Sequence, residues 1–391
     1  ADPGDARLNA RLVSTAAMVS AQPDSSFPKS ASDDAELEAT YRFLSNKRVS
    51  PAAILAPHVR QTLRRAGTCG RVVIAHDTTE FNFGTSRRAD LGYVAQGASF
   101  GFFGHFAIAI DGSESRMPLG VAAHEMLRRE VKKKTEKKEK TDPSNEFHRW
   151  ARVIKEAQEQ FESVRPIHVM DREADSYELM VDLAKSRTRF VIRLAQSTRV
   201  TAKESVSMAE VIERARTVAR RDVPITARGR SPLPSRRKSF PPRDARLAHL
   251  EVSATTVTVA RPHSSRADQP KTLTLNVVRV FEPNPPEQES PVEWRLWTNE
   301  PVNTEAEILA IVDAYRCRWR IEEFFKALKT GCAIEKRQLE SYQGLINTVA
   351  LMAPIAWRLL HLRTLAREQE HLPATHALTP SQLLCLGAVL R

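Results

Sequence analysis

Three acidic residues spread along this sequence could together carry out metal-dependent chemistry on phosphate esters. Asp77 and Asp171 each follow a short apolar run typical of a buried strand, and Glu322 lies in a segment with helical periodicity. Mg²⁺ and Mn²⁺ prefer such oxygen ligands, and two ions about 4 Å apart can activate a water or a sugar hydroxyl at a phosphodiester. The sequence therefore predicts these three carboxylates as ligands of two divalent cations.

Cationic side chains and a phenol are predicted beside Glu322. On a helix that turns about 100° per residue, one face would carry Tyr315, Arg318, Glu322, Lys326 and Lys329. Apolar side chains would fill the opposite face: Cys317, Ile321, Phe324, Phe325 and Leu328. Because guanidinium and ammonium groups bind phosphates, this face suits a phosphodiester substrate. An ordinary solvated helix shows a similar mixture of charges, and that alternative stays open.

The two aspartates are predicted at the carboxyl ends of their strands, where sites assemble in open α/β sheets. Asp77 could also cap a helix together with Glu80, although the alternation over 81–83 favours a strand. Asp175 is predicted to cap the helix that follows the second strand, which leaves Asp171 available as a ligand.

Several other kinds of site are disfavoured. The four cysteines form no CxxC pair and the eleven histidines show no HExxH spacing, so zinc is not expected. No GxxxxGK[ST] loop is present for nucleotide phosphates. The formal net charge of +12 favours nucleic acid as a partner, and basic segments lie at 128–140 and 228–246.

The spacing of the residues around Glu322 resembles the Y-x2-R-x3-E-x6-K signature of bacterial cut-and-paste DNA transposases of the DDE class. The resemblance extends over nearly the whole sequence, in the order GDARLNARLV (4–13), YRFLSN (41–46), DTT (77–79), DREAD (171–175), RFVIR (189–193) and WRLWTNEPV (294–302). Each string alone is weak evidence, but their shared order and spacing make the resemblance specific.

The resemblance implies roles for individual residues. Asp77, Asp171 and Glu322 would hold two Mg²⁺ or Mn²⁺ ions, and Trp294 would receive a base flipped out of the duplex, with Trp297 as a competing candidate. The implied DNA contacts are Tyr315, Arg318, Lys326, Lys329, Arg193, Trp294, Arg7, Arg11, Tyr41 and Arg42, of which the last four would read the transposon end. For the last four, a solvated surface without DNA contacts is the alternative.

The implied reaction begins with a metal-dependent nick that exposes a 3′-hydroxyl at the transposon end. Hairpin formation, hairpin opening and strand transfer to target DNA would follow. The alternatives are a ribonuclease-H-like nuclease, a catalytically impaired DNA-binding inhibitor or repressor, and a basic interaction protein.

The predicted fold is α/β, with a ribonuclease-H-like mixed sheet, a β-rich insertion and helical regions at both ends. The predicted divisions are a helical end-binding region (1–70), the first part of the core (71–200), the insertion (201–298), the second part of the core with the Glu322 helix (299–340), and a helical carboxyl-terminal region (341–391).

The expected partners are double-stranded transposon ends and target DNA. The family implies a homodimer on paired ends, but this sequence stops at Arg391, where relatives continue into dimer-forming helices. The expectation of a homodimer on paired ends is therefore weaker for this sequence alone. A membrane span is not expected, since Pro354 interrupts the longest apolar run, and four unpatterned cysteines suit a reducing cytoplasm. The resemblance implies a bacterial cytoplasm and association with the nucleoid.

Overall fold

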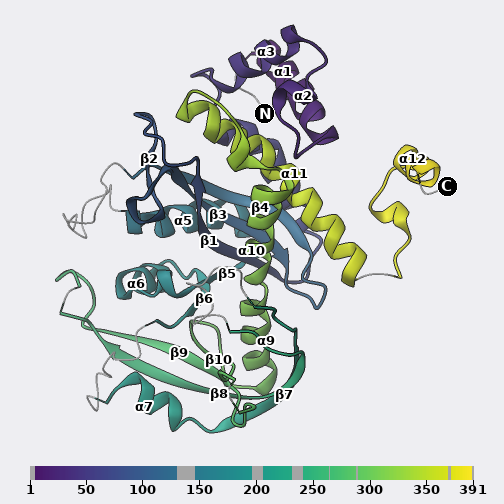
Figure 1. Cartoon of the computed structure of the whole chain (residues 1–391). Coiled ribbons are helices and arrows are strands. Elements are labelled where there is room, and N and C mark those ends of the chain that lie inside the picture. The colour runs from purple at the N-terminus through teal and green to yellow at the C-terminus, as the bar shows by residue number, and fades with distance from the viewer. Residues whose placement is uncertain are drawn as a thin grey trace. The chain divides into compact units, whose positions relative to one another are not determined.

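The computed structural model describes residues 5–129, 146–195, 206–230, 241–263, 265–287, 289–368 and 371–389. The chain divides into two compact units, Ala1–Pro166 with Cys317–Arg391, and Ile167–Arg316 (Figure 1). Most of the basic segment predicted at 128–140 lies outside the described residues, and so does 231–240 of the second basic segment.

The first unit combines antiparallel strands with helices from both ends of the chain. Its strands are β1 (Val72–Asn82), β2 (Gly92–Val94), β3 (Ser99–Asp111) and β4 (Pro118–Leu127). Its helices are α1 (Ala6–Ala21), α2 (Phe27–Ser30), α3 (Asp34–Leu44), α4 (Pro51–Ala66), α5 (Arg149–Phe161), α10 (Trp319–Lys326), α11 (Tyr342–Glu368) and α12 (Pro380–Val389). As the sequence predicts, the described residues up to Gly70 contain helices and no strand, and Ser50 caps α4 by accepting a bond from the Ala53 amide at 3.2 Å.

Successive side chains of β1 point alternately to the two faces of the sheet in this unit. β1 pairs antiparallel with β3, which also pairs with β2 and β4. Val72 and Ile74 are buried in one apolar cluster with α5 residues such as Phe161. Because successive side chains of a strand point to opposite faces, Val73 and Ala75 lie on the other face, and α10 packs on β1.

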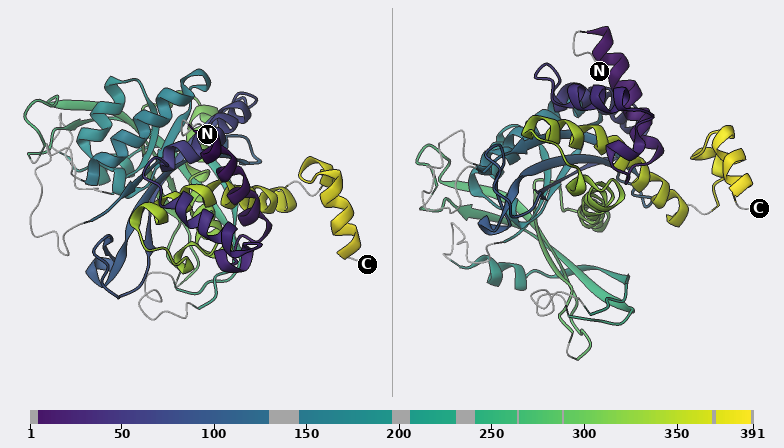
Figure 2. Two further views of the ribbon diagram at one scale, coloured as in Figure 1. Left: turned by 90° about the horizontal axis from the view of Figure 1, so that it is seen from above. Right: turned by 45° about the horizontal axis from the view of Figure 1, so that its top comes forward.

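The long helix α11 forms part of the core of the first unit. Among the described helices it is long and apolar enough to cross a membrane by length and composition, but 61% of its most apolar window is buried inside the structure. It continues through Pro354 and packs against α3, α4 and β4, as Figure 2 lets the reader follow. A buried core helix has the same composition as a membrane span, and the packing of α11 is that of a core helix.

Two buried polar side chains attach the amino-terminal helices to this unit. Arg337 donates to the carbonyl oxygens of Pro23 and Ser25, between α1 and α2, and to that of Cys332 at 3.1 Å. Asn347 of α11 donates to the carbonyls of Leu44 at 2.8 Å and Val49 at 3.1 Å. Every one of these acceptors is a backbone oxygen.

The environment of His58 leads to a prediction of how the stability of the first unit depends on pH. Its Nε2 accepts a bond from the Val121 amide at 3.0 Å, and burial with the nearby Arg65 charge lowers its pKa to about 3. The unfolded chain binds this proton near pH 6.5, so the contribution of His58 to stability is complete above that pH and falls as the pH drops toward 3. His58→Gln keeps a hydrogen-bond acceptor but does not titrate. We therefore expect this variant to lose less unfolding free energy than wild type when the pH is lowered from 7 to 5.

The measurement is urea unfolding at pH 7 and pH 5 for wild type, His58→Gln and His371→Gln. His371 is an exposed histidine of the same unit, so its replacement should leave the pH dependence unchanged. An equal change in unfolding free energy between pH 7 and pH 5 for wild type and His58→Gln would contradict the prediction.

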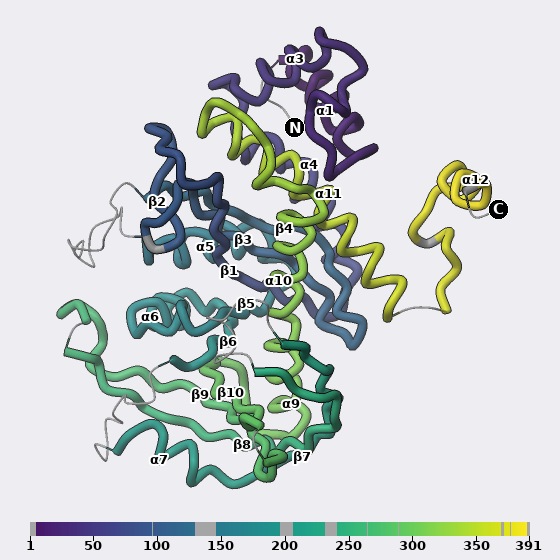
Figure 3. The backbone as a smooth tube through the Cα atoms, in the orientation of Figure 1, coloured from purple at the N-terminus to yellow at the C-terminus, as the bar shows by residue number. Residues whose placement is uncertain are grey.

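The second unit starts with a parallel strand pair and continues as an antiparallel sheet. Its strands are β5 (Ile167–Met170), β6 (Arg189–Arg193), β7 (Thr217–Ile225), β8 (Arg246–Ala260), β9 (Thr272–Phe281) and β10 (Glu293–Thr298). Its helices are α6 (Tyr177–Lys185), α7 (Met208–Glu213) and α9 (Glu305–Arg316). β5 runs parallel to β6, whereas β6, β10, β9, β8 and β7 pair antiparallel in that order; Figure 3 shows the long pair β8 and β9.

These elements confirm the predicted α/β fold class, with parallel and antiparallel strand pairs, a β-rich part and helical terminal regions. Along the chain, the elements of the predicted core follow in the order β1, β3, β4, α5, β5, α6 and β6. The sequence did not predict β2, β7 or α7, and it ended the strand β1 too early. The predicted division boundaries stay predictions.

Candidate functional site

Asp77 lies in the middle of β1, which corrects the prediction that it follows the end of a strand. The apolar run stops at His76, but the ladder with β3 continues to Asn82 and pairs Asp77 with Phe106. Polar side chains are accommodated here because one end of the strand is only half buried. Asp77 therefore shares the face of Val73 and Ala75, toward α10.

Aromatic packing brings Glu322 toward Asp77. Phe106, the register partner of Asp77, packs against Phe324 and Phe325 of α10 with ring centroids 5.5 and 6.0 Å apart. The predicted apolar face of this segment is confirmed, because Cys317, Ile321, Phe324, Phe325 and Leu328 are all buried. With that face fixed on the sheet, the polar side of α10 lies beside Asp77.

Arg318 joins the two carboxylates. One of its terminal nitrogens lies 3.3 Å from Asp77 Oδ2 and the other 2.5 Å from Glu322 Oε1. The side chain of Arg318 is 11% exposed, against 18% for Asp77 and 37% for Glu322. One guanidinium thus bridges two of the three predicted metal ligands. The sequence placed Arg318 on an open face and did not predict this bridge.

The prediction of one continuous helix from Tyr315 to Lys329 is wrong. α9 ends at Arg316, a turn covers 317–318, α10 covers Trp319–Lys326, and Ala327–Gly331 is a π-helix. At the turn, the amides of Arg320 and Ile321 bond to carbonyls three residues earlier, which is tighter than α-helical spacing. A single helical wheel therefore does not apply, and Tyr315 belongs to the second unit while Arg318 belongs to the first.

The two lysines beyond Glu322 differ in their surroundings. Lys326 is exposed at the end of α10. Lys329 donates to the Glu80 carbonyl and lies 3.4 Å from Glu335, whose Oε1 accepts from the Asn82 amide at 2.9 Å. Lys329 consequently ties the end of this helical segment to β1, a structural role that its position in sequence did not predict.

A buried polar network lies on the opposite face of β1. The Thr78 hydroxyl lies 2.8 Å from His105 Nδ1 and accepts a bond from Arg149 Nε at 3.1 Å. Burial lowers the pKa of His105 well below its ordinary value, so its ring is neutral at pH 7. This network, which the sequence analysis missed, fixes the residue next to Asp77; its only signal was a histidine inside the apolar run of β3.

In the second unit, Asp171 lies where predicted, directly after β5. Its side chain accepts a bond from the Glu173 amide at 2.9 Å and caps a short 3₁₀ helix. The capping role predicted for Asp175 is wrong: Ser176 has the extended backbone of an N-cap and precedes α6, whereas Asp175 accepts from the Ala195 amide at 2.7 Å.

Trp294 and Tyr315 lie together in the second unit. Their rings meet edge to face at 5.5 Å between centroids, with Trp294 partly exposed and Tyr315 buried. Trp297 is fully buried, so the competing candidate for a flipped base is a core residue. Arg193 ends β6 and donates to the Glu293 carbonyl at 3.2 Å.

The four predicted end-reading residues lie on α1 and α3. Arg7 and Arg42 are exposed, whereas Arg11 and Tyr41 are partly buried. Arg42 is 3.7 Å from Glu38, and the Tyr41 ring meets Phe27 edge to face at 6.0 Å. Their DNA contacts stay predictions.

The chemistry of the site suits a hard cation. Asp77 and Glu322 offer carboxylate oxygens, which Mg²⁺ and Mn²⁺ prefer, and both already bind one positive group. In the part of the chain that the structure describes, no group of three or more His, Cys, Asp or Glu side chains is gathered as a metal site. The three-carboxylate ligand set therefore stays a prediction.

The structure is that of an α/β protein in which one arginine bridges two carboxylates, Asp77 and Glu322. Residues 70–355 match the family model described as the transposase DDE domain, and residues 1–49 match that described as transposase DNA-binding. Since the first match covers most of the chain, the chain belongs to the DDE transposase family.

A solved structure is also similar to this chain. It is the piggyBac transposase in a synaptic complex with hairpin DNA, determined by cryo-EM, with 11% identity and a TM-score of 0.38. The match covers 91% of this chain and 65% of that chain, so this chain spans just under two thirds of its length.

Proposed function

We propose that this protein is a DNA transposase that cleaves transposon ends and joins them to target DNA with the help of divalent cations. The observation that carries the proposal is the pairing of Asp77 and Glu322 around one guanidinium within a chain of the DDE transposase family. Within this family we propose a relationship to the transposases with the Y-R-E-K signature, such as that of transposon five.

In this proposal Asp77, Asp171 and Glu322 hold two Mg²⁺ or Mn²⁺ ions. When bound, such ions supply the positive charge that favours attack of water or a 3′-hydroxyl on a phosphodiester. Arg318 and Lys326 orient phosphates of the transposon end, since guanidinium and ammonium groups bind phosphate oxygens. The proposed partners are transposon ends and target DNA, with a homodimer on paired ends, in the bacterial cytoplasm.

The test is strand-resolved cleavage of a labelled duplex that carries the terminal repeat of the element encoding this chain. Wild type should nick one defined phosphodiester with Mg²⁺ or Mn²⁺ and should not do so with EDTA. Metal-dependent cleavage without preference for the repeat would indicate a nuclease. Repeat binding without cleavage would indicate a repressor or inhibitor.

The hairpin step gives a separate prediction at Trp294. This ring is partly exposed and supported at its edge by Tyr315, so it is able to stack on an extruded base. Stacking of this kind contributes about 1–3 kcal/mol per base, so we expect Trp294→Ala to lower the hairpin yield about tenfold while nicking continues. Denaturing gels of the labelled end would measure both products, and wild-type amounts of nick and hairpin would exclude this role for Trp294.

A further inference from the structure

Arg318 occupies one oxygen of each of the two carboxylates that the proposed function assigns to divalent cations in the first unit. It contacts Asp77 Oδ2 at 3.3 Å and Glu322 Oε1 at 2.5 Å, one nitrogen to each. Asp77 lies on β1 and Glu322 on α10, so the guanidinium ties a strand to a helix as well as balancing their charge. Charge-assisted bonds in such a half-buried place are stronger than exposed ones.

A guanidinium and a divalent cation cannot both use these oxygens in this geometry. Mg²⁺ requires oxygen ligands at about 2.0–2.1 Å in near-octahedral arrangement. Two cationic groups about 4 Å apart also repel each other strongly in a partly buried site. The other Asp77 oxygen, Oδ1, already accepts a bond from the Thr78 amide at 2.7 Å. A metal ion that binds through Asp77 Oδ2 and Glu322 Oε1 must therefore displace Arg318 from at least one of them.

We propose that Arg318 is an internal counter-ion that holds Asp77 and Glu322 together and restrains metal binding until the guanidinium moves away. The proposal rests on the proposed function, because it takes these two carboxylates as metal ligands. Once released, the guanidinium is available to a DNA phosphate, so phosphate binding and metal binding favour each other. In this way the site acquires its metal most readily when a backbone phosphate is present.

The test measures Mn²⁺ affinity without DNA, by the electron paramagnetic resonance signal of free Mn²⁺ at pH 7. Arg318→Gln should bind Mn²⁺ about tenfold more tightly than wild type, a difference of about 1.4 kcal/mol. Arg318→Lys should show a smaller gain, since an ammonium keeps the charge but lacks the planar fork that reaches both carboxylates. Circular dichroism would verify that the variants are folded.

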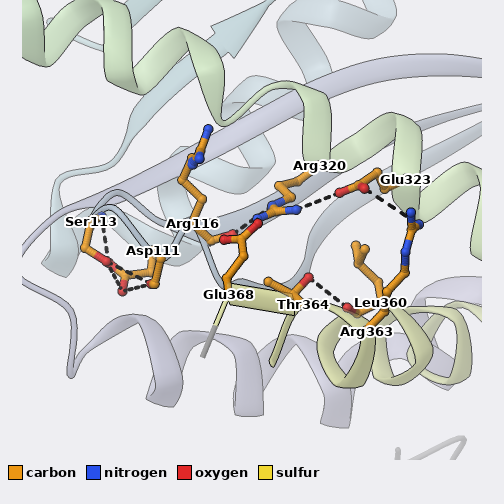
Figure 4. A network of polar contacts seen from close by, with 10 residues as sticks. Asp111, Ser113, Arg116, Arg320, Glu323, Leu360, Arg363, Thr364 and Glu368 are labelled. Atoms are coloured by element: carbon orange, nitrogen blue, oxygen red, sulfur yellow. Dashed lines mark hydrogen bonds and ion pairs between the residues drawn. The ribbon is translucent and has the colours of Figure 1, made fainter. Parts of the chain in front are cut away.

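Arg320→Gln is the matched control. Arg320 lies two residues away on α10 and bonds to Glu323, Glu368 and the Arg116 carbonyl (Figure 4). Its replacement removes the same charge without touching Asp77 or Glu322, so the Mn²⁺ affinity should stay within about twofold of wild type. An equal gain in Arg318→Gln and Arg320→Gln would show a general charge effect and overturn the proposal.

Two further variants separate failure of this proposal from failure of the proposed function. If Asp77→Asn and Glu322→Gln weaken Mn²⁺ binding but Arg318→Gln leaves it at the wild-type value, the metal site is correct and the counter-ion role is wrong. If neither carboxylate variant changes Mn²⁺ binding, the metal site itself is wrong, and the role of Arg318 is wrong with it.

Discussion

Glu322→Gln is expected to lower metal-dependent cleavage of the transposon end at least about a thousandfold, because loss of an essential catalytic group typically costs that much. Glutamine has nearly the same shape and can still accept a bond from Arg318, so the fold should be retained. It lacks the negative charge that a divalent cation requires, so the loss should appear in cleavage and not in DNA binding. Strand-resolved gels and a mobility-shift assay would measure the two quantities.

Glu323→Gln provides the matched control for this experiment. Glu323 is the next residue of α10, but it bonds to Arg320 at 2.8 Å and lies 3.6 Å from Arg363. Its replacement should leave cleavage within a fewfold of wild type. Comparable cleavage by Glu322→Gln and wild type would show that Glu322 has no catalytic role.

The largest effect on stability is expected for Gly101→Ala. Gly101 of β3 pairs with Asn82 at the end of β1, and a Cβ atom there would lie 1.9 Å from the Phe81 carbonyl oxygen. Because the obstacle is backbone, no side chain can rotate away, and the β1–β3 ladder must shift. We expect the free energy of unfolding to fall by about 3 kcal/mol or more, as measured by urea denaturation.

Gly70→Ala is the control for the glycine experiment. Gly70 precedes β1, and a Cβ atom there would meet nothing within 4 Å. Its replacement should change the free energy of unfolding by less than about 1 kcal/mol. Similar stability of the Gly70 and Gly101 variants would show that the ladder tolerates a side chain at Gly101.

The sequence predicted most elements of both units because their apolar patterns are local. The strand before Asp171 and the buried side of α10 follow from short runs whose period depends on few residues. The start of α4 at Ser50 and Pro51 is a local signal of the same kind, since a cap acts within one turn. Local signals of this kind need no knowledge of distant partners.

The errors arose where distant partners decide the local structure. Asp77 continues a strand only because β3 supplies a ladder beside it, and nothing in residues 77–80 reveals that partner. The Arg318 bridge likewise joins residues 241 positions apart. The break after Arg316 coincides with the boundary between two compact units, and helical periodicity alone continues across it.

The way the amino-terminal helices are attached affects which of their residues can change during evolution. Arg337 and Asn347 bind Pro23, Ser25, Leu44 and Val49 through main-chain oxygens, which every amino acid possesses. Exposed side chains in the part that matches the DNA-binding family model can therefore change during evolution while the same anchors persist, whereas buried ones such as Phe27, which lies under the Arg337 guanidinium, are constrained by packing. Under the proposed function, exposed residues of that segment could change, and with them the end sequence that is read, while these main-chain anchors remain.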